Sequence, residues 1–256
     1  MRLTSALLLS GVACQPQIPK VEGQVIDVWE NPIEGATVMV EGGTERPLTD
    51  AEGHYALQRV PGTHVAKAGH KDYIQQHVQL EMSEEGPPPQ GPTFVLYPKP
   101  KSKGLFLVMH DRYEAIKPQH VQIVGGAVRS YRGIQDTGEV VAETAKPQLL
   151  WHTDLRQDEI MRLGLELRRL EFVDKAQLPG TEGLTEVSVN LYVDAGQIPI
   201  ERIPLRSRSD YLIEPVGALQ PGVYAFQTQD LLSASDGTAF SQLPPELRVV
   251  HPFQVR

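Results

Sequence analysis

The chain has 256 residues, of which 40% are hydrophobic and 22% are charged, and its formal net charge is −8. This length allows one large or two medium domains, and the composition is that of a folded protein with a core. The 22 glycines and 21 prolines, set against 6% aromatic residues, favour short strands joined by tight turns over a helical bundle. The acidic balance argues against nucleic acid as a partner, because binding to phosphates requires clustered Lys and Arg.

The amino terminus has the pattern of an export signal. A short positive start leads into an apolar run over residues 3–10, which is too short to span a bilayer, and small residues then precede Cys14. This pattern resembles the signal of bacterial lipoproteins. The resemblance implies a signal peptide over residues 1–13, and a tether over residues 14–19 that carries lipid on Cys14. The alternative is a plain secretory signal with a chance cysteine.

The lipoprotein resemblance implies a place in the cell. Lipid on Cys14 would anchor the protein to a membrane of the bacterial cell envelope, since several acyl chains bind a bilayer almost permanently. Gln15 stands where an aspartate resembles an inner-membrane retention signal, so the outer membrane is favoured over the inner one. Because Cys14 is the only cysteine, we expect the exported fold to be stabilised by its core and not by disulfides.

Residues 20–98 show alternating apolar residues with turn signals about every ten residues. Such a pattern predicts a small antiparallel β-sandwich of about seven strands. In one turn, Asp50 is expected to accept backbone N–H bonds and Gly53 to adopt a positive φ, which places Tyr55 and Leu57 on one face of the next strand.

Four spaced motifs in this segment resemble the carboxypeptidase regulatory-like domain, a transthyretin-like sandwich. They are Gly23-Gln24-Val25, residues 31–38, residues 49–55 and residues 60–63. The resemblance implies a non-catalytic accessory or binding module without peptidase activity. A zinc carboxypeptidase needs a His with a Glu three residues later, and none of the eight histidines has one. An isopeptide-bonded adhesin sandwich is an alternative relative, but Lys20 lies outside the first alternating strand and the strand around Lys67 carries no acid.

A Pro- and Lys-rich linker over residues 99–103 is expected to separate this domain from a second β-rich, sandwich-like domain over residues 104–256. The fold class predicted for the whole chain is therefore all-β, with two β-sandwich domains. In the second domain, the motif around Tyr224 and Phe226 resembles a β-corner in which an inward Tyr and Phe pack below a tight turn. Residues 155–172 fit either a helix or a strand, and Gly164 favours a helical or loop entry at 156–161 followed by a strand.

Three groups of residues are candidates for chemistry. The polar run from His110 to Glu114 could supply an acid and a base, but neighbouring residues of a strand point to opposite faces, so a surface turn is favoured. Three histidines of the first domain could bind a metal ion, and three of its aromatic residues could stack on a sugar. These are His64, His70 and His77, and Trp29, Tyr55 and Tyr73. Separate imidazoles and core packing are favoured for them, so no catalytic, metal-binding or cofactor-binding residue is predicted, and Cys14 is the one site residue.

These observations together predict a lipid-anchored cell-envelope protein that acts as a non-enzymatic protein-binding or scaffolding module, with no cofactor. Exposed strand edges would offer the contact surface for an envelope protein partner. One alternative is a carbohydrate-binding lipoprotein with a polysaccharide as its ligand. The other is an enzyme whose site in the second domain the linear order hides.

Overall fold

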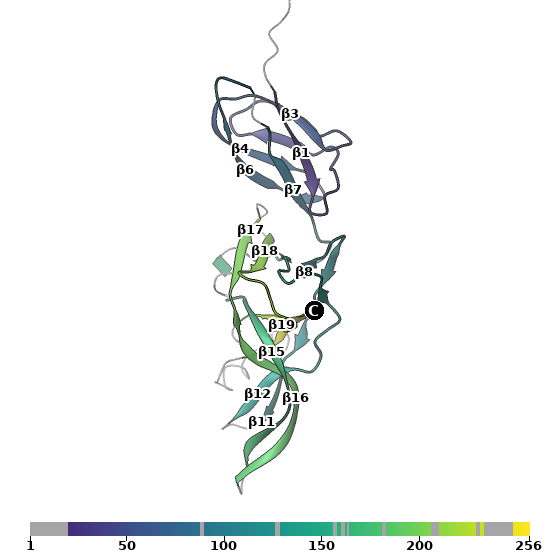
Figure 1. Cartoon of the computed structure of the whole chain (residues 1–256), viewed down its shortest axis with the longest axis vertical. Coiled ribbons are helices and arrows are strands. Elements are labelled where there is room, and N and C mark those ends of the chain that lie inside the picture. Colours follow the sequence, from purple (N-terminus) through teal and green to yellow (C-terminus); the bar gives the residue numbers. More distant parts are fainter. Residues whose placement is uncertain are drawn as a thin grey trace, which may run out of the picture.

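The computed structural model describes residues 20–87, 90–125, 129–155, 158, 159, 162, 164–180, 183–205, 210–228, 231, 232 and 248–256. The described elements are β-strands, arranged as two bodies stacked along the long axis (Figure 1). We call β1–β7 the N-terminal sandwich and β8–β20 the C-terminal region. The lipid-attachment candidate Cys14 lies outside the described residues, as does the proposed signal peptide before it.

Two sheets form the N-terminal sandwich, in the strand orders β3-β1-β7-β5 and β2-β4-β6. The strands are β1 (Lys20–Asp27), β2 (Thr37–Val40), β3 (His54–Gln58), β4 (Gly62–Gly69), β5 (Tyr73–Ile74), β6 (Gln76–Met82) and β7 (Thr93–Pro98). The predicted sandwich of seven short strands is confirmed. One detail of the prediction is wrong: the sandwich is not purely antiparallel, because β1 and β7 pair in parallel.

The turn before β3 forms as its residues predict. Oδ1 of Asp50 accepts the backbone N–H groups of Glu52 and His54 at 3.1 and 2.7 Å, and Gly53 has a φ of 76°. Tyr55 and Leu57 consequently share the buried face of β3, at 3% and 2% exposure.

Tyr55 extends over the neighbouring strand β1 to the residues that precede β7. Its hydroxyl donates to the carbonyl of Pro92 at 2.8 Å, and its ring packs against Phe94 with centroids 5.9 Å apart. The ring passes over Gly23, where an added Cβ would lie 2.4 Å from the hydroxyl oxygen. Glycine is therefore required at position 23 by space, and not by its φ.

The C-terminal region contains an eight-stranded sheet, ordered β10-β20-β19-β15-β16-β12-β11 with β13 paired to β20, and a five-stranded sheet ordered β17-β18-β14-β8-β9. Its first strands are β8 (Gly104–Val108), β9 (Tyr113–Ala115), β10 (Gln119–His120), β11 (Gln122–Gly125), β12 (Ser130–Ile134), β13 (Val141–Ala142) and β14 (Leu149–His152). The later strands are β15 (Glu166–Gly180), β16 (Gly183–Ile198), β17 (Ile200–Pro204), β18 (Asp210–Pro215), β19 (Gly222–Gln227) and β20 (Val249–Val255). For the open segment 155–172, the strand begins at Glu166, and most of 156–163 lies outside the described residues.

The main core of this region lies between its two sheets. Leu107, Leu149 and Ile213 of the five-stranded sheet pack in one cluster with residues such as Leu167 and Phe253 of the eight-stranded sheet. The region is therefore a second sandwich, as predicted.

The predicted β-corner is also confirmed. Tyr224 and Phe226 are 1% and 0% exposed, and the Tyr224 hydroxyl donates to the carbonyl of Gln220 at 2.7 Å. The corner thus fixes the start of β19 below the preceding turn.

A separate apolar cluster joins the two sandwiches. It combines Ile74 and Tyr97 of the N-terminal sandwich with Phe106, Leu150 and Leu212 of the C-terminal region. Because buried residues of both bodies share this cluster, the junction is packed and is more than a covalent connection.

A turn after β1 adds a polar contact to the junction. Oδ1 of the buried Asp27 accepts the backbone N–H groups of Trp29 and Asn31, both at 2.9 Å, and so holds the turn that presents Trp29. The Trp29 indole N–H donates to the carbonyl of Met109 at 3.0 Å, and its ring packs on Tyr113 with centroids 5.1 Å apart. Asp27 thereby positions a side chain that links the two sandwiches.

Candidate binding surface

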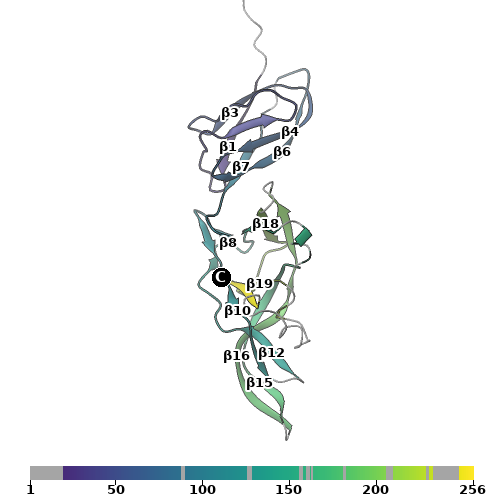
Figure 2. The same cartoon turned by 180° about the vertical axis from the view of Figure 1, so that it is seen from behind.

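The two longest of the described strands form a β-ribbon at the end of the molecule away from the N-terminal sandwich (Figure 1, Figure 2). β15 and β16 pair antiparallel from Leu167 and Ile198 at the base to Gly180 and Gly183 at the tip. Leu167 is fully buried in the main core, whereas Gly180 and Gly183 are exposed. From Leu167 to Gly180 the ribbon spans about 40 Å, at about 3.3 Å per residue.

Two β-bulges interrupt the ribbon. The register shifts between Arg169 and Leu170 and again between Val173 and Lys175. Beside the second shift, Asn190 has a φ of 49°, a left-handed conformation that Asn tolerates better than most residues. Since bulges bend a strand and increase its twist, they turn the ribbon relative to the sheet that carries its base.

The hairpin β11–β12 supports the ribbon. Leu178, Val189 and Leu191 of the ribbon are buried, although they lie beyond the main core. A Cβ added at Gly125 of β11 would lie 3.2 Å from a methyl carbon of Leu178, so the hairpin approaches the ribbon closely. The ribbon is therefore a supported arm and not an isolated pair of strands, which would be marginally stable in water.

Large apolar side chains of the ribbon and its hairpin face solvent. Phe172 and Leu184 are 54% and 72% exposed, and Ile123 of β11 is 42% exposed. Phe172 packs only partly, against Tyr192 with ring centroids 5.1 Å apart. Aromatic residues are enriched at protein interfaces, so the exposed Phe172 makes the ribbon a candidate contact surface.

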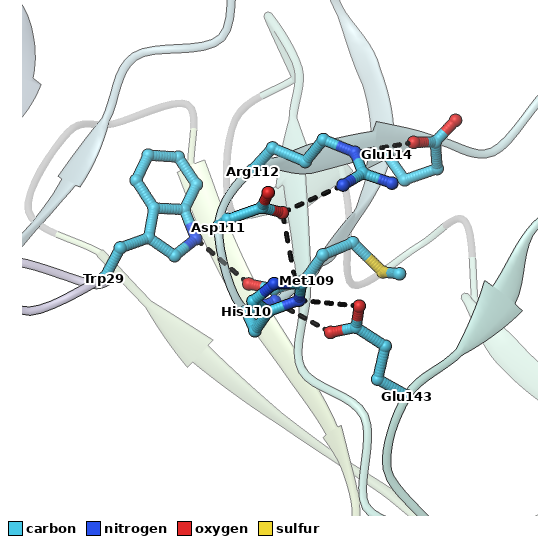
Figure 3. A network of polar contacts seen from close by, with 7 residues as sticks. All are labelled: Trp29, Met109, His110, Asp111, Arg112, Glu114 and Glu143. Carbon is cyan, nitrogen blue, oxygen red and sulfur yellow. Dashed lines mark hydrogen bonds and ion pairs between the residues drawn. The ribbon is translucent and has the colours of Figure 1, made fainter.

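The polar cluster at His110 lies in the turn between β8 and β9, as the sequence predicts (Figure 3). The structure adds a partner that is far away in sequence. Glu143 accepts the His110 backbone N–H through Oε2 and contacts His110 Nδ1 through Oε1, both at 2.8 Å. Arg112 pairs with Asp111 at 2.9 Å and with Glu114 at 3.3 Å.

This cluster is arranged as a surface ion network. The hydrogen bond to Glu143 and the nearby charge of Asp111 raise the pKa of His110. The backbone and side-chain hydrogen bonds from His110 lower the pKa of Glu143. The two contacts between His110 and Glu143 hold the turn in place, and Met109 in the same turn accepts the Trp29 hydrogen bond. The geometry gives the cluster a positioning role at the junction.

The three histidines of the N-terminal sandwich do not converge. His64 lies opposite Leu80 in the β4–β6 ladder, His77 lies opposite Lys67, and His70 follows β4 with its ring against Tyr73. Within the described ranges, no group of three His, Cys, Asp or Glu side chains is placed to bind a metal ion.

The three aromatic residues considered for sugar stacking also lie apart. Tyr55 is buried in the core and Trp29 packs at the junction, so they do not form a row with Tyr73 on one sheet face. Lys67 does meet an acid, Glu41, with Nζ 2.6 Å from Oε1. The Glu41 side chain is 56% exposed, so this is a surface ion pair and not the core site that an isopeptide bond would need.

The described part of the chain has no helix that is long and apolar enough to cross a membrane. No family model matches the sequence, and no curated protein matches it. Among solved structures, the chain is similar to the major pilin subunit BcpA of Bacillus cereus. A variant of BcpA aligns with 11% identity and a TM-score of 0.25, over 93% of this chain and 67% of that chain. Unmodified BcpA aligns with 11% identity and a TM-score of 0.22, over 93% and 68%.

A further similar structure is a candidate carbohydrate-binding protein from Bacteroides uniformis. It aligns with 8% identity and a TM-score of 0.20, over 82% of this chain and 88% of that chain. Similarities at this level do not identify a shared function. The resemblance of residues 20–98 to the carboxypeptidase regulatory-like domain stays a prediction.

Proposed function

We propose that this protein is a lipid-anchored component of the bacterial cell envelope that binds another envelope protein through the β15–β16 ribbon. The observation that carries the proposal is the ribbon itself. It spans about 40 Å at the usual rise per residue, it is supported by the β11–β12 hairpin, and it exposes Phe172 and Leu184 to solvent. Such an arm presents side chains for contact at a distance from the core.

The arrangement of the two bodies supports the proposal. Asp27, at the end of β1, lies at the junction, and Lys20 begins β1 seven residues earlier, so the strand runs from the far end of the N-terminal sandwich toward the C-terminal region (Figure 1). Lipid on Cys14 would anchor the protein at that far end. The packed junction would then hold the ribbon away from the membrane.

The ribbon contact is tested by site-specific photo-crosslinking in the bacterium that makes the protein. A photoreactive residue at Phe172 or Leu184 is expected to give an adduct with one defined polypeptide. The same residue at Val216, which is 55% exposed but lies outside the ribbon, serves as the control and is expected to give none. Equal adducts from all three positions, or none from the ribbon, would contradict the proposal.

The anchor is tested separately. The wild-type protein is expected to incorporate radiolabelled palmitate and to sediment with membranes, and a Cys14→Ser variant is expected to do neither. A Cys14→Ser variant that still sediments with membranes would refute lipid anchoring without affecting the ribbon contact.

A further inference from the structure

The N-terminal sandwich has a second surface of interest, separate from the ribbon. A groove of about 800 Å³ opens on the outer face of β3, β1 and β7. This volume is within the range of small-molecule sites. It is lined by residues of β1 and β3 and by the segment Pro47–Asp50.

Polar side chains cross the floor of the groove in a row. Gln24 of β1 lies opposite His54 of β3 and beside Thr93 of β7, so three hydrogen-bonding side chains stand on adjacent strands. The Gln24 amide is fixed, because its Nε2 donates to the carbonyl of Glu52 at 2.9 Å. Next to this row, Glu22 lies opposite Ala56, whose small side chain leaves the groove open.

Ala56, which lines the groove, also has a backbone pair at the free edge of β3. Val25 donates its N–H to the carbonyl of Gly53, which makes this antiparallel pair a hydrogen-bonded one. Since hydrogen-bonded pairs alternate along the ladder, the backbone groups of Tyr55 and Leu57 also bond to β1. The N–H and C=O of Ala56, between them, point the other way, toward the free edge of β3. Within the described residues, these two groups of Ala56 have no protein partner.

The flanking positions of this edge are covered. At one end, Asp50 bonds both backbone groups of His54, at 2.7 Å to the N–H and 3.0 Å to the carbonyl. At the other end, Oε2 of Glu45 accepts the N–H of Gln58 at 3.0 Å. An added β-strand needs several consecutive free groups, so strand addition is blocked here and a compact ligand fits better.

We propose that this groove binds a saccharide unit of an uncharged glycan. A hydroxyl group is both donor and acceptor, so two neighbouring sugar hydroxyls can accept from the Ala56 N–H and donate to its C=O. Glu22, opposite Ala56, would bond a remaining hydroxyl of that unit, and Gln24, His54 and Thr93, which lie further along the groove, would bond hydroxyls of the adjoining unit. The groove is lined by two carboxylates, those of Glu22 and Asp50, and by the ammonium group of Lys20. Because these charges do not sum to a positive value, the groove would not attract an anionic sugar.

The test is an NMR titration of the 15N-labelled chain with three neutral disaccharides at millimolar concentrations: cellobiose, lactose and di-N-acetylchitobiose. At least one is expected to shift the backbone amide of Ala56 in a saturable way. Failure of all three to shift that amide would overturn the proposal. Binding of an acetylated tripeptide at Ala56 in place of all three sugars would also overturn it.

Matched variants locate the site. Ala56→Val fills the groove and is expected to weaken sugar binding at least tenfold, whereas Gln58→Val, two residues along the same strand, leaves it unchanged. Thr93→Val removes one hydroxyl and is expected to weaken binding about two- to tenfold, the effect of one lost hydrogen bond. Thr63→Val on β4 is its control. Equal effects of the groove variants and the control variants on sugar binding would refute the location. If Ala56→Val does not fold, the comparison of Thr93→Val with Thr63→Val is the test of the location.

Discussion

Trp29 is expected to set how firmly the two sandwiches are held together. A Trp29→Ala substitution removes the indole hydrogen bond to Met109 and the ring contact with Tyr113. The hydrogen bond contributes about 1 kcal/mol and the aromatic pair about 1 kcal/mol more. The population of separated sandwiches should therefore rise about thirtyfold, the equivalent of about 2 kcal/mol. Trp29→Phe keeps a ring and should show about half of this free-energy change.

The separation is measured by pulsed electron spin resonance between two spin labels, one on each sandwich. Cys14 is the only cysteine, so a Cys14→Ser background with new cysteines at Glu52 and Glu201 gives labels without interference. The parent chain should give one narrow distance distribution, and Trp29→Ala a broad one. Phe172→Ala removes an aromatic ring away from the junction and is the control. A distribution as narrow in Trp29→Ala as in the parent would refute the reasoning.

Three further results are expected. Gly23→Ala places a Cβ against the buried tyrosine hydroxyl and should lower the free energy of unfolding by about 1–3 kcal/mol, whereas Gly217→Ala, which meets open space, should be neutral in thermal melts. Tyr224→Phe should cost about 1 kcal/mol by urea unfolding, because the corner loses its hydrogen bond to Gln220; an unchanged midpoint would rule out that contribution. Burial lowers the pKa of His251 to about 4 in the folded protein. Above about pH 6.5 the histidine is neutral in both the folded and the unfolded chain, and the free energy of unfolding has its full value. Below that pH the unfolded chain takes up the proton first, so the free energy of unfolding falls. Between pH 7.5 and pH 5 the loss should be about 2 kcal/mol and should be absent in His251→Gln; an equal slope in both proteins would contradict it.

Local chemistry explains which parts of the fold could be predicted. The turn at Asp50 and Gly53 and the corner at Tyr224 are encoded by residues within a few positions of each other, and both formed as expected. The parallel pairing of β1 with β7 has no such signal, because its partners, such as Val25 and Phe94, are distant in sequence and alternation is the same for either direction.

The candidate surfaces were harder to predict for the same reason. Glycine and proline near the end of β15 indicate a turn before β16. The alternating apolar residues of these strands, however, do not show that the side chains of Phe172 and Leu184 stay exposed. Glu143 meets His110 only through the tertiary fold, so the polar run in the β8–β9 turn gave no sign of it. The free backbone pair of Ala56 depends on the contacts of Asp50 and Glu45 on either side, which no spacing rule supplies.

The parallel ladder between β1 and β7 determines how the N-terminal sandwich would respond to mechanical load. The chain enters at Lys20, at the start of β1, and leaves at Pro98, at the end of β7. Tension applied between these two points pulls the neighbouring strands in opposite directions along their length. Their hydrogen bonds would then be sheared simultaneously and not opened one after another, which is the more resistant geometry for a domain tethered at one end and pulled at the other.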